Sequence, residues 1–457
     1  MSLTTPLSVQ KLQTALHAKA KESPNFRFYA LYDKVHREDI LAFAYECCKA
    51  NGGAAGVDEQ TFEDIEAYGV KRWLDELTQE LKSRTYQPKP VRRVYIPKPD
   101  GKQRPLGIPA IRDRVAETAA VLVLEPIFEA DLPSEQYAYR QDRSALDAVE
   151  HVHKLINFGH GQIVDADLSG YFDSIPHSEL LKSVARRIVD GAMLHLIKMW
   201  LDAPVEETDE RGNEHRSTRN RDQGRGTPQG SPISPLLSNL YMRRFVLGWK
   251  KLGHEKRLQA YIVNYADDLV ICCRSGAEQA LTTMRDMMSK LKLTVNETKT
   301  RVCSLPEEKF DFLGYTFGRC YSTRTGRAYL GTVPSKKRVQ RICRAVSEET
   351  ERRTTQLDSK TLVGKLNRMM VGWANYFCLG PVSKAYEAVD RHAKKRLRQW
   401  LCTKHKVPWP GAQRFPAESL YDVFGLVCLP KRPAAFRVRN RESFPRAGCG
   451  NSARPVR

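Results

Sequence analysis

The stretch Val263-Asn264-Tyr265-Ala266-Asp267-Asp268-Leu269-Val270-Ile271 decides the fold. Two adjacent carboxylates separate two short, β-prone apolar runs, which predicts a strand–turn–strand unit with both acids at the bend. Adjacent like charges at such a bend are costly unless a cation offsets them. Carboxylate oxygens are ligands that Mg²⁺ prefers. Taken alone, the pair fits an ordinary Asp-Asp hairpin turn equally well.

A second acidic stretch runs Ile163-Val164-Asp165-Ala166-Asp167-Leu168-Ser169-Gly170-Tyr171-Phe172-Asp173. Strand alternation places Asp165 and Asp167 on one face, opposite Ala166 and Leu168. If the two acidic strands are neighbours, Asp167 meets the Asp267–Asp268 pair in a two-metal site. Two metals about 3.5–4 Å apart can activate an attacking 3′-hydroxyl and stabilise a leaving pyrophosphate.

The composition indicates a polyanionic partner. The chain has 457 residues, enough for two to four domains, and 41% of them are hydrophobic, which excludes a disordered protein. Lys and Arg number 74 against 53 Asp and Glu, and the resulting charge of +21 is typical of proteins that bind nucleic acid. The alternative is a basic protein that its charge keeps soluble.

The sequence predicts neither secretion nor membrane insertion. The first residues lack a basic stretch followed by an apolar one, and no apolar run reaches the length of a membrane span. The eleven cysteines contain no Cys-x-x-Cys pair, so we expect free thiols in a reducing cytosol.

Three further segments carry groups suited to a triphosphate. The stretch from 96 to 109 predicts a basic hairpin on which Lys98 and Arg104 could neutralise phosphate charge. Gly226-Thr-Pro-Gln-Gly-Ser-Pro232 is a rigid loop ahead of a helix, and Lys299 is another candidate phosphate partner. Taken one at a time, each of these segments could be an ordinary turn or a solvent-exposed charged group.

Together and in this order, the blocks resemble the reverse transcriptases of bacterial group II introns. The resemblance covers about residues 30 to 430 and includes Gly56-Val-Asp58 ahead of the fingers and Phe312-Leu-Gly-Tyr315 as the last palm strand. It implies an α+β right-hand polymerase. Its expected parts are a helical extension (1–60), fingers and palm (61–330), a helical thumb or maturase domain (331–400) and a small basic DNA-binding-type domain with its tail (401–457).

The resemblance also assigns roles to residues. Asp167, Asp267 and Asp268 match the catalytic, metal-binding triad, with Asp268 as the least direct ligand. Phe172 matches the aromatic gate that excludes a ribose 2′-hydroxyl, although it could also be a core aromatic. The expected nucleotide-binding residues are Lys98, Arg104, Ser169, Gly170, Tyr171, Phe172, Gln229 and Lys299.

The sequence differs from the family's motifs at two places and resembles the family's thumb in a further segment. Ser231 stands where many members carry a second Gly, and residues 140–144 depart from the usual Arg-Pro-Gly-Arg-Ser. The stretch from 366 to 377 resembles the maturase thumb, in which Trp373, Tyr376 and Phe377 are expected in the core. The expected RNA-facing groups are Lys365, Arg368 and the run from His392 to Arg398.

The resemblance implies an RNA-directed DNA polymerase that is also the maturase of its intron. It would use two Mg²⁺ ions, with Mn²⁺ as a substitute, and dNTPs, an intron RNA template, a DNA or RNA primer and a DNA target. We expect it in the bacterial cytoplasm, with the nucleoid or a ribonucleoprotein. Without paired Cys-x-x-Cys motifs, the family's endonuclease module is not expected. The alternatives are a related polymerase of phage defence or CRISPR spacer acquisition, and a maturase without polymerase activity.

Overall fold

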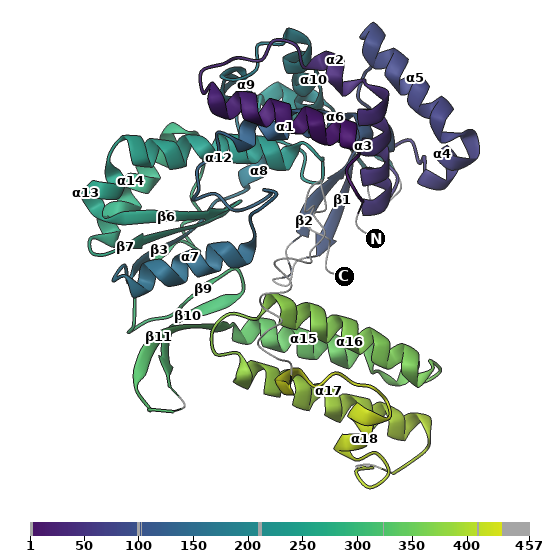
Figure 1. Cartoon of the computed structure of the whole chain (residues 1–457), viewed down its shortest axis with the longest axis vertical. Helices are drawn as coiled ribbons and strands as arrows, with labels where there is room; N and C mark the ends of the chain where they lie inside the picture. Colours follow the sequence, from purple (N-terminus) through teal and green to yellow (C-terminus); the bar gives the residue numbers. More distant parts are fainter. Residues whose placement is uncertain are drawn as a thin grey trace.

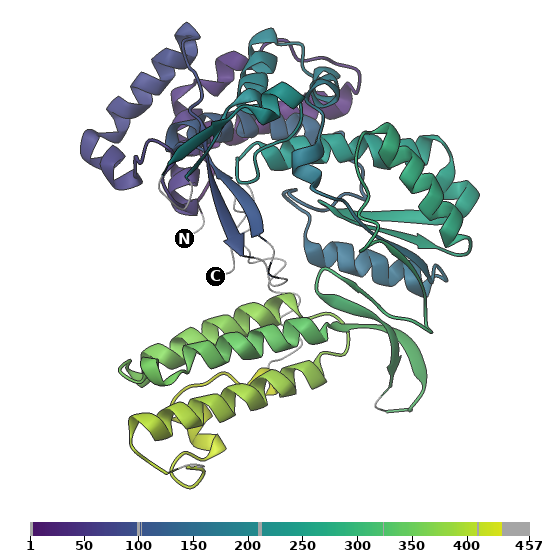
Figure 2. The same ribbon diagram turned by 180° about the vertical axis from the view of Figure 1, so that it is seen from behind.

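The computed structural model describes residues 3–97, 101, 103–208, 213–322, 324–408 and 411–431. Figure 1 shows a helical body that contains the N-terminus, a sheet in the middle and a group of long helices at the far end, and Figure 2 shows the same parts from behind. The arrangement confirms the expected α+β architecture of fingers, palm and helical thumb.

The palm is a four-stranded antiparallel sheet in the order β6-β7-β3-β8. Alternate side chains of β7 enter two different cores, because Leu269 and Ile271 lie in one and Val270 lies in the other. A shift of one residue in register would therefore exchange both sets. The strands and the long helices beside them are β3 (Gln162–Asp167), β6 (Ala260–Tyr265), β7 (Asp268–Cys273), β8 (Arg301–Ser304), α7 (Ala145–Asn157), α12 (Ser234–Lys251) and α14 (Ala277–Lys290).

The fingers combine a second sheet, in the order β2-β1-β4-β5, with helices from the N-terminal segment. Helices α1 and α3 pack on α6, and their buried residues belong to the same core as one face of the palm. Residues 3–60 therefore fold onto the fingers. The elements are α1 (Leu7–Glu22), α2 (Tyr32–Val35), α3 (Glu38–Asn51), α4 (Phe62–Tyr68), α5 (Val70–Ser83), β1 (Val91–Pro97), β2 (Gln103–Ile108), α6 (Ile111–Glu129), β4 (Val205–Thr208) and β5 (Glu214–Ser217).

Shorter helices lie in the connections between these elements, most of them between palm and fingers. They are α8 (Tyr171–Ser174), α9 (His177–Ala185), α10 (Gly191–Asp202), α11 (Arg219–Gln223) and α13 (His254–Leu258). Among the helices that the structure describes, none has both the length and the apolar composition that crossing a membrane requires.

The thumb is a bundle of three long helices with a core of its own. The predicted boundary at residue 400 falls inside α17, and Phe415, Leu420 and Leu429 join the same core, so the described residues after 400 pack as part of the thumb. The elements are α15 (Lys336–Glu349), η1 (Arg352–Thr354), α16 (Ser359–Tyr376), α17 (Ser383–Lys404), α18 (Ala417–Asp422) and η2 (Leu429–Lys431). The predicted basic tail from 432 to 457 lies outside the described residues.

A third sheet connects palm and thumb. It has the order β11-β10-β9 and consists of β9 (Phe310–Phe312), β10 (Tyr315–Tyr321) and β11 (Ala328–Pro334). Its buried residues share a core with α7, the palm strands and Phe377 of the thumb. The thumb is therefore joined to the palm sheet by apolar packing as well as by the chain.

Candidate metal and nucleotide site

The three predicted carboxylates lie at one end of the palm sheet. Strands β3 and β7 pair in a register that places Asp167 opposite Asp268. Tyr265 of β6 also pairs with Asp268, so Asp267 lies in a two-residue turn between β6 and β7. The structure therefore brings Asp167, Asp267 and Asp268 together, as expected from neighbouring acidic strands.

Asn264 supports the turn that presents Asp267. Ala266 has a φ of 56°, in the left-handed region that residues with a Cβ seldom adopt. The buried Asn264 side chain donates a hydrogen bond to the Ala266 carbonyl oxygen at 2.8 Å and a longer one to the Asp268 carbonyl oxygen at 3.3 Å. Sequence reasoning missed Asn264, whose only signal was its place next to the acidic turn.

Two side chains from the loop after α14 hold Asp167. Asn296 Nδ2 donates to Asp167 Oδ2 at 3.0 Å, and Lys299 Nζ lies 3.1 Å from the same oxygen. Lys299, predicted as a phosphate partner, thus lies directly at the carboxylates. Asn296 was missed, because its contact with Asp167 crosses 129 positions of the sequence.

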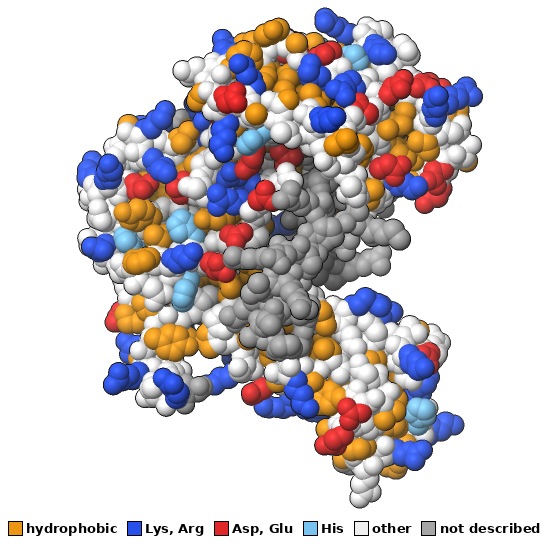
Figure 3. Space-filling model, in the orientation of Figure 1, with side chains coloured by type: hydrophobic (Ala, Val, Ile, Leu, Met, Phe, Trp, Pro, Cys, Tyr) orange, Lys and Arg blue, Asp and Glu red, His pale blue; other side chains and the backbone are white. Residues whose placement is uncertain are grey.

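The electrostatics of the carboxylates fit a divalent cation. Burial and repulsion from Asp167 raise the pKa of Asp267. Asp268 reaches solvent at the rim, but the surrounding protein and the neighbouring carboxylates raise its pKa to about 7. A bound cation would favour the charged forms, and carboxylate oxygens suit Mg²⁺ or Mn²⁺. Figure 3 shows acidic side chains along the inner side of the palm.

The carboxylates do not form a closed coordination shell in their present rotamers. Within the described part of the chain, no three Asp, Glu, His or Cys side chains converge closely enough to hold an ion as they stand. Asp167 is engaged by Lys299 and Asn296, so it would have to turn toward a metal. The type of the donors fits the metal, whereas their present positions do not enclose one.

The family resemblance implies that backbone N–H groups around Ser169 to Tyr171 form a cradle for the triphosphate, but fewer of these amides are free than expected. The Ser169 amide already donates to the Thr294 carbonyl oxygen at 2.9 Å, so it is not free to bind phosphate. Gly170 has a φ of 53° and caps the short helix α8, whose first amides have no partner within the helix. The Tyr171 side chain is buried and donates to the Ser238 carbonyl oxygen, so only its backbone could face a nucleotide.

Phe172 lies half-buried at the edge of this cradle. Its ring makes an edge contact with that of Tyr171, with ring centroids 5.6 Å apart, and packs against the main core. Its carbonyl oxygen accepts a hydrogen bond from the Thr227 amide at 2.8 Å, which ties the predicted gate to the loop that carries Gln229. The position agrees with both a gate and a core contact.

The fingers hairpin lies against the Gln229 loop. The Gly107 amide donates to the Gln229 carbonyl oxygen at 2.6 Å, and Gln229 Nε2 donates to Asp173 Oδ2 at 3.3 Å. Arg104 pairs with Ile96 across the hairpin, and its charge acts on the Asp267 carboxylate. Lys98 lies outside the described residues.

Gly230 is required by this contact. Its φ is 117°, and a Cβ at this position would overlap the Gly107 carbonyl oxygen. We expect Gly230→Ala to lower the free energy of unfolding by about 3 kcal/mol and to raise the KM for dNTPs. Gly253→Ala is the matched control, because Gly253 also has a positive φ but no atom within 4 Å of the added Cβ, and it should cost about 1 kcal/mol. Urea denaturation of both variants measures the difference, and equal losses would contradict the steric argument.

Ser231 has a partner that the sequence did not reveal. Its hydroxyl donates a short hydrogen bond to Glu117 of α6, which also accepts the Ile233 amide at 3.4 Å. Burial raises the pKa of Glu117 to about 8. The serine that stands in place of the family's second Gly therefore anchors the loop to the fingers.

The aromatic residues of the thumb motif lie where the thumb meets the palm. Phe377 is buried in the connecting core, and Trp373 and Tyr376 pack against that core. In the predicted RNA-facing run, Arg396 donates to the Ser347 and Thr350 carbonyl oxygens, so its guanidinium stabilises the end of α15. This part of the run is structural.

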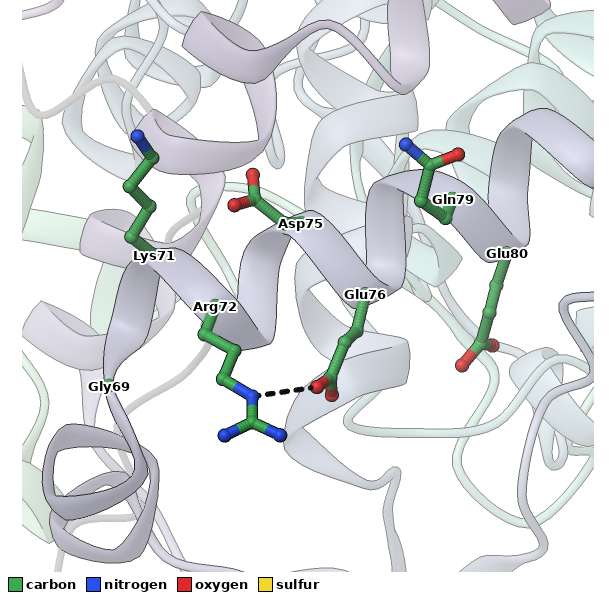
Figure 4. Close-up of a pocket in the computed structure, with 7 residues that line it drawn as sticks. All are labelled: Gly69, Lys71, Arg72, Asp75, Glu76, Gln79 and Glu80. Atoms are coloured by element: carbon green, nitrogen blue, oxygen red, sulfur yellow. Dashed lines mark ion pairs between the residues drawn. The ribbon is translucent and has the colours of Figure 1, made fainter.

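One surface hollow lies away from the carboxylates. It has a volume of about 740 Å³ and runs along α5, where Arg72 pairs with Glu76 at 3.4 Å, and Figure 4 shows its lining residues on one exposed helix face. A second hollow of about 550 Å³ includes Arg225, Arg285 and Lys292 and borders Thr294, which accepts the Ser169 amide. Only the second one adjoins the predicted cradle.

Comparisons with known proteins agree with the geometry. The profile described as "Reverse transcriptase (RNA-dependent DNA polymerase)" matches residues 96–317, and "Group II intron, maturase-specific domain" matches residues 339–415. Protein YkfC of Escherichia coli is 31% identical over 367 residues, which cover 72% of this chain and 93% of YkfC.

A second relative is much longer than this chain. Group II intron-encoded protein LtrA of Lactococcus lactis subsp. cremoris is 34% identical over 230 residues. These residues cover 49% of this chain but 36% of LtrA. The chain therefore matches little more than a third of that relative.

Proposed function

Because this chain belongs to the family of group II intron-encoded reverse transcriptases and maturases, we propose that it copies intron RNA into DNA at Asp167, Asp267 and Asp268. The observation that carries the proposal is the pairing of β3 with β7, which gathers these three carboxylates at one end of a sheet. This reaction class needs such a cluster, because negative charge develops on the transferred phosphate and on both flanking oxygens.

The palm residues would bind the metal ions and the phosphates. Asp167 and Asp267 would hold two Mg²⁺ ions, or Mn²⁺ in their place, with Asp268 behind them. When bound, the ions would supply the charge that activates the primer 3′-hydroxyl and stabilises the leaving pyrophosphate. The Lys299 ammonium lies 3.1 Å from the Asp167 carboxylate, and it would move from there to the phosphates when a nucleotide binds.

The nucleotide would lie between the palm and the fingers. Backbone amides at Gly170 and Tyr171 and the cations Lys98 and Arg104 would bind the triphosphate, with Ser169 contributing its hydroxyl. The Phe172 ring would sterically exclude the 2′-hydroxyl of a ribonucleotide, and Gln229 would pack beneath the base of the incoming nucleotide. The contact between Gly107 and Gln229 supports this arrangement, because it fixes the hairpin over the loop.

The maturase role rests on the thumb. We infer that it binds the intron RNA for splicing and that the same complex carries the RNA to a DNA target, where a DNA or RNA primer starts synthesis. The match to the maturase-specific domain favours this role over phage defence or spacer acquisition. Such a complex would reside in the bacterial cytoplasm, bound to RNA or to the nucleoid.

One pair of assays tests both activities. Wild-type protein should extend oligo(dT) on poly(rA) with dTTP, lose this activity in excess chelator and regain it with Mg²⁺ or Mn²⁺. The same preparation should accelerate splicing of its intron RNA at near-physiological magnesium. RNA binding should weaken steeply as the salt concentration rises, because contacts with RNA phosphates release counterions. If the primer is not extended, the polymerase assignment is wrong. If the protein does not change the rate of splicing, the maturase assignment is wrong.

A further inference from the structure

Two tyrosines join the thumb to the palm through reciprocal hydrogen bonds. The Tyr315 hydroxyl, on β10, donates to the Tyr376 carbonyl oxygen at the end of α16, at 2.5 Å. The Tyr376 hydroxyl donates back to the Leu313 carbonyl oxygen at 2.7 Å. Each phenol thus binds the backbone of the other element, which fixes both distance and orientation.

The palm side of this contact is an unusual turn. Phe312 pairs with Tyr315, so Leu313 and Gly314 form a two-residue turn, with φ values of 49° and 85°. Two positive φ angles define the turn type that Asn-Gly favours, whereas leucine is disfavoured at its first position. The turn therefore needs support from outside, and the Tyr376 hydroxyl binds the carbonyl oxygen of the strained residue.

Apolar packing surrounds the two hydrogen bonds. The Tyr315 ring lies 5.9 Å from the Tyr376 ring and 5.2 Å from the Phe377 ring, measured between centroids. A Cβ on Gly314 would approach the Arg338 side chain at 3.0 Å and the Phe377 ring at 3.2 Å. The turn is thus pressed against the thumb as closely as a glycine allows.

The same contact lies in a core that also includes residues next to the acidic turn. Burial, Tyr265 and Asp268 raise the pKa of Tyr376, so its hydroxyl stays protonated and remains a donor. Tyr265 precedes the acidic turn, and it packs against the core that also contains Val263 and Val270 of the catalytic strands. The contact between thumb and palm therefore shares a core with the strands that lead to the carboxylates.

We propose that Tyr315 and Tyr376 form a clasp that fixes the thumb relative to the catalytic turn and so holds the primer terminus over the carboxylates. Tyr376 is then a positioning residue for the primer strand. The inference rests on the proposed polymerase function, since a primer must be present for the clasp to position it. A loosened clasp should shorten the time that the primer stays in place and leave the dNTP pocket, on the fingers side of the palm, unchanged.

Tyr376→Phe and Tyr315→Phe test the clasp, because each removes one hydroxyl and keeps the ring. The matched control is Tyr386→Phe, which removes a tyrosine hydroxyl that donates to the Ala374 carbonyl oxygen at 2.9 Å inside the thumb. Extension of oligo(dT) on poly(rA) with a heparin trap gives the product length per binding event. We expect it to fall about five-fold in both clasp variants, the effect of one lost hydrogen bond, with the KM for dTTP unchanged.

The control separates positioning from stability. Tyr386→Phe should lose thermal stability to a similar extent but keep the wild-type product length. Clasp variants that match this control overturn the proposal, as does a change confined to the KM for dTTP. If the wild-type protein makes no DNA at all, the proposed function fails instead.

A second substitution tests whether the clasp acts through the turn. Asparagine adopts positive φ more readily than leucine, so Leu313→Asn should make the turn less dependent on Tyr376. The loss caused by Tyr376→Phe should then be smaller in the Leu313→Asn background than in the wild type. Equal losses in both backgrounds would show that the turn is not the coupled element and would overturn this part of the proposal.

Discussion

Asp267→Asn should lower the rate of nucleotide addition by about 10³-fold or more, while binding of primer and template RNA changes little. Asparagine keeps the shape of the side chain but removes the charge that a metal requires. A metal ion at this position supplies several kcal/mol to the transition state, and ~4 kcal/mol corresponds to about 10³ in rate. Single-turnover extension of oligo(dT) on poly(rA), at saturating Mg²⁺ and dTTP, measures the rate.

Asp165→Asn is the matched control for this prediction. Asp165 lies on the same face of β3 as Asp167, but its carboxylate pairs with Arg301 at 3.5 Å. We therefore expect a change of less than about 10-fold, the effect of a partly exposed ion pair. A full rate in Asp267→Asn, or equal losses in both variants, would remove Asp267 from the metal site.

Local patterns in the sequence were sufficient to predict the palm strands that carry the three carboxylates. Short apolar runs flank Asp167 and the Asp267–Asp268 pair and predict strands, and adjacent β pairing then places the acids at one end of the sheet. The fold class followed from the order of the blocks. These features depend on residues close in sequence, which is why they could be predicted.

The supporting residues could not be predicted in the same way. Glu117 meets Ser231 across 114 positions, and Tyr315 meets Tyr376 across 61, so no local pattern records either contact. The Ser169 amide was assigned to phosphate because the sequence does not show its bond to Thr294. The boundary at residue 400 was placed by resemblance, whereas α17 continues through it.

Phe172→Val should increase incorporation of ribonucleotides relative to deoxyribonucleotides by about 10- to 200-fold, the range that differences of one small group in a pocket produce. The Phe172 ring is half-buried beside the cradle, and its removal would open space where a 2′-hydroxyl would project. The measurement is the ratio of kcat/KM for UTP and dTTP on poly(rA).

The control for Phe172 makes the same substitution before the start of β3, whereas Asp167 lies at the end of that strand. Phe158 is 72% exposed at the end of α7, so Phe158→Val should leave both discrimination and stability near wild type. A Phe172 that served only the core would lose stability on truncation without a change in sugar preference. If Phe172→Val unfolds more easily but still rejects UTP, Phe172 is a core residue. If UTP is accepted with little loss of stability, Phe172 selects the sugar, because only a ring that faces the nucleotide can alter discrimination without weakening the fold.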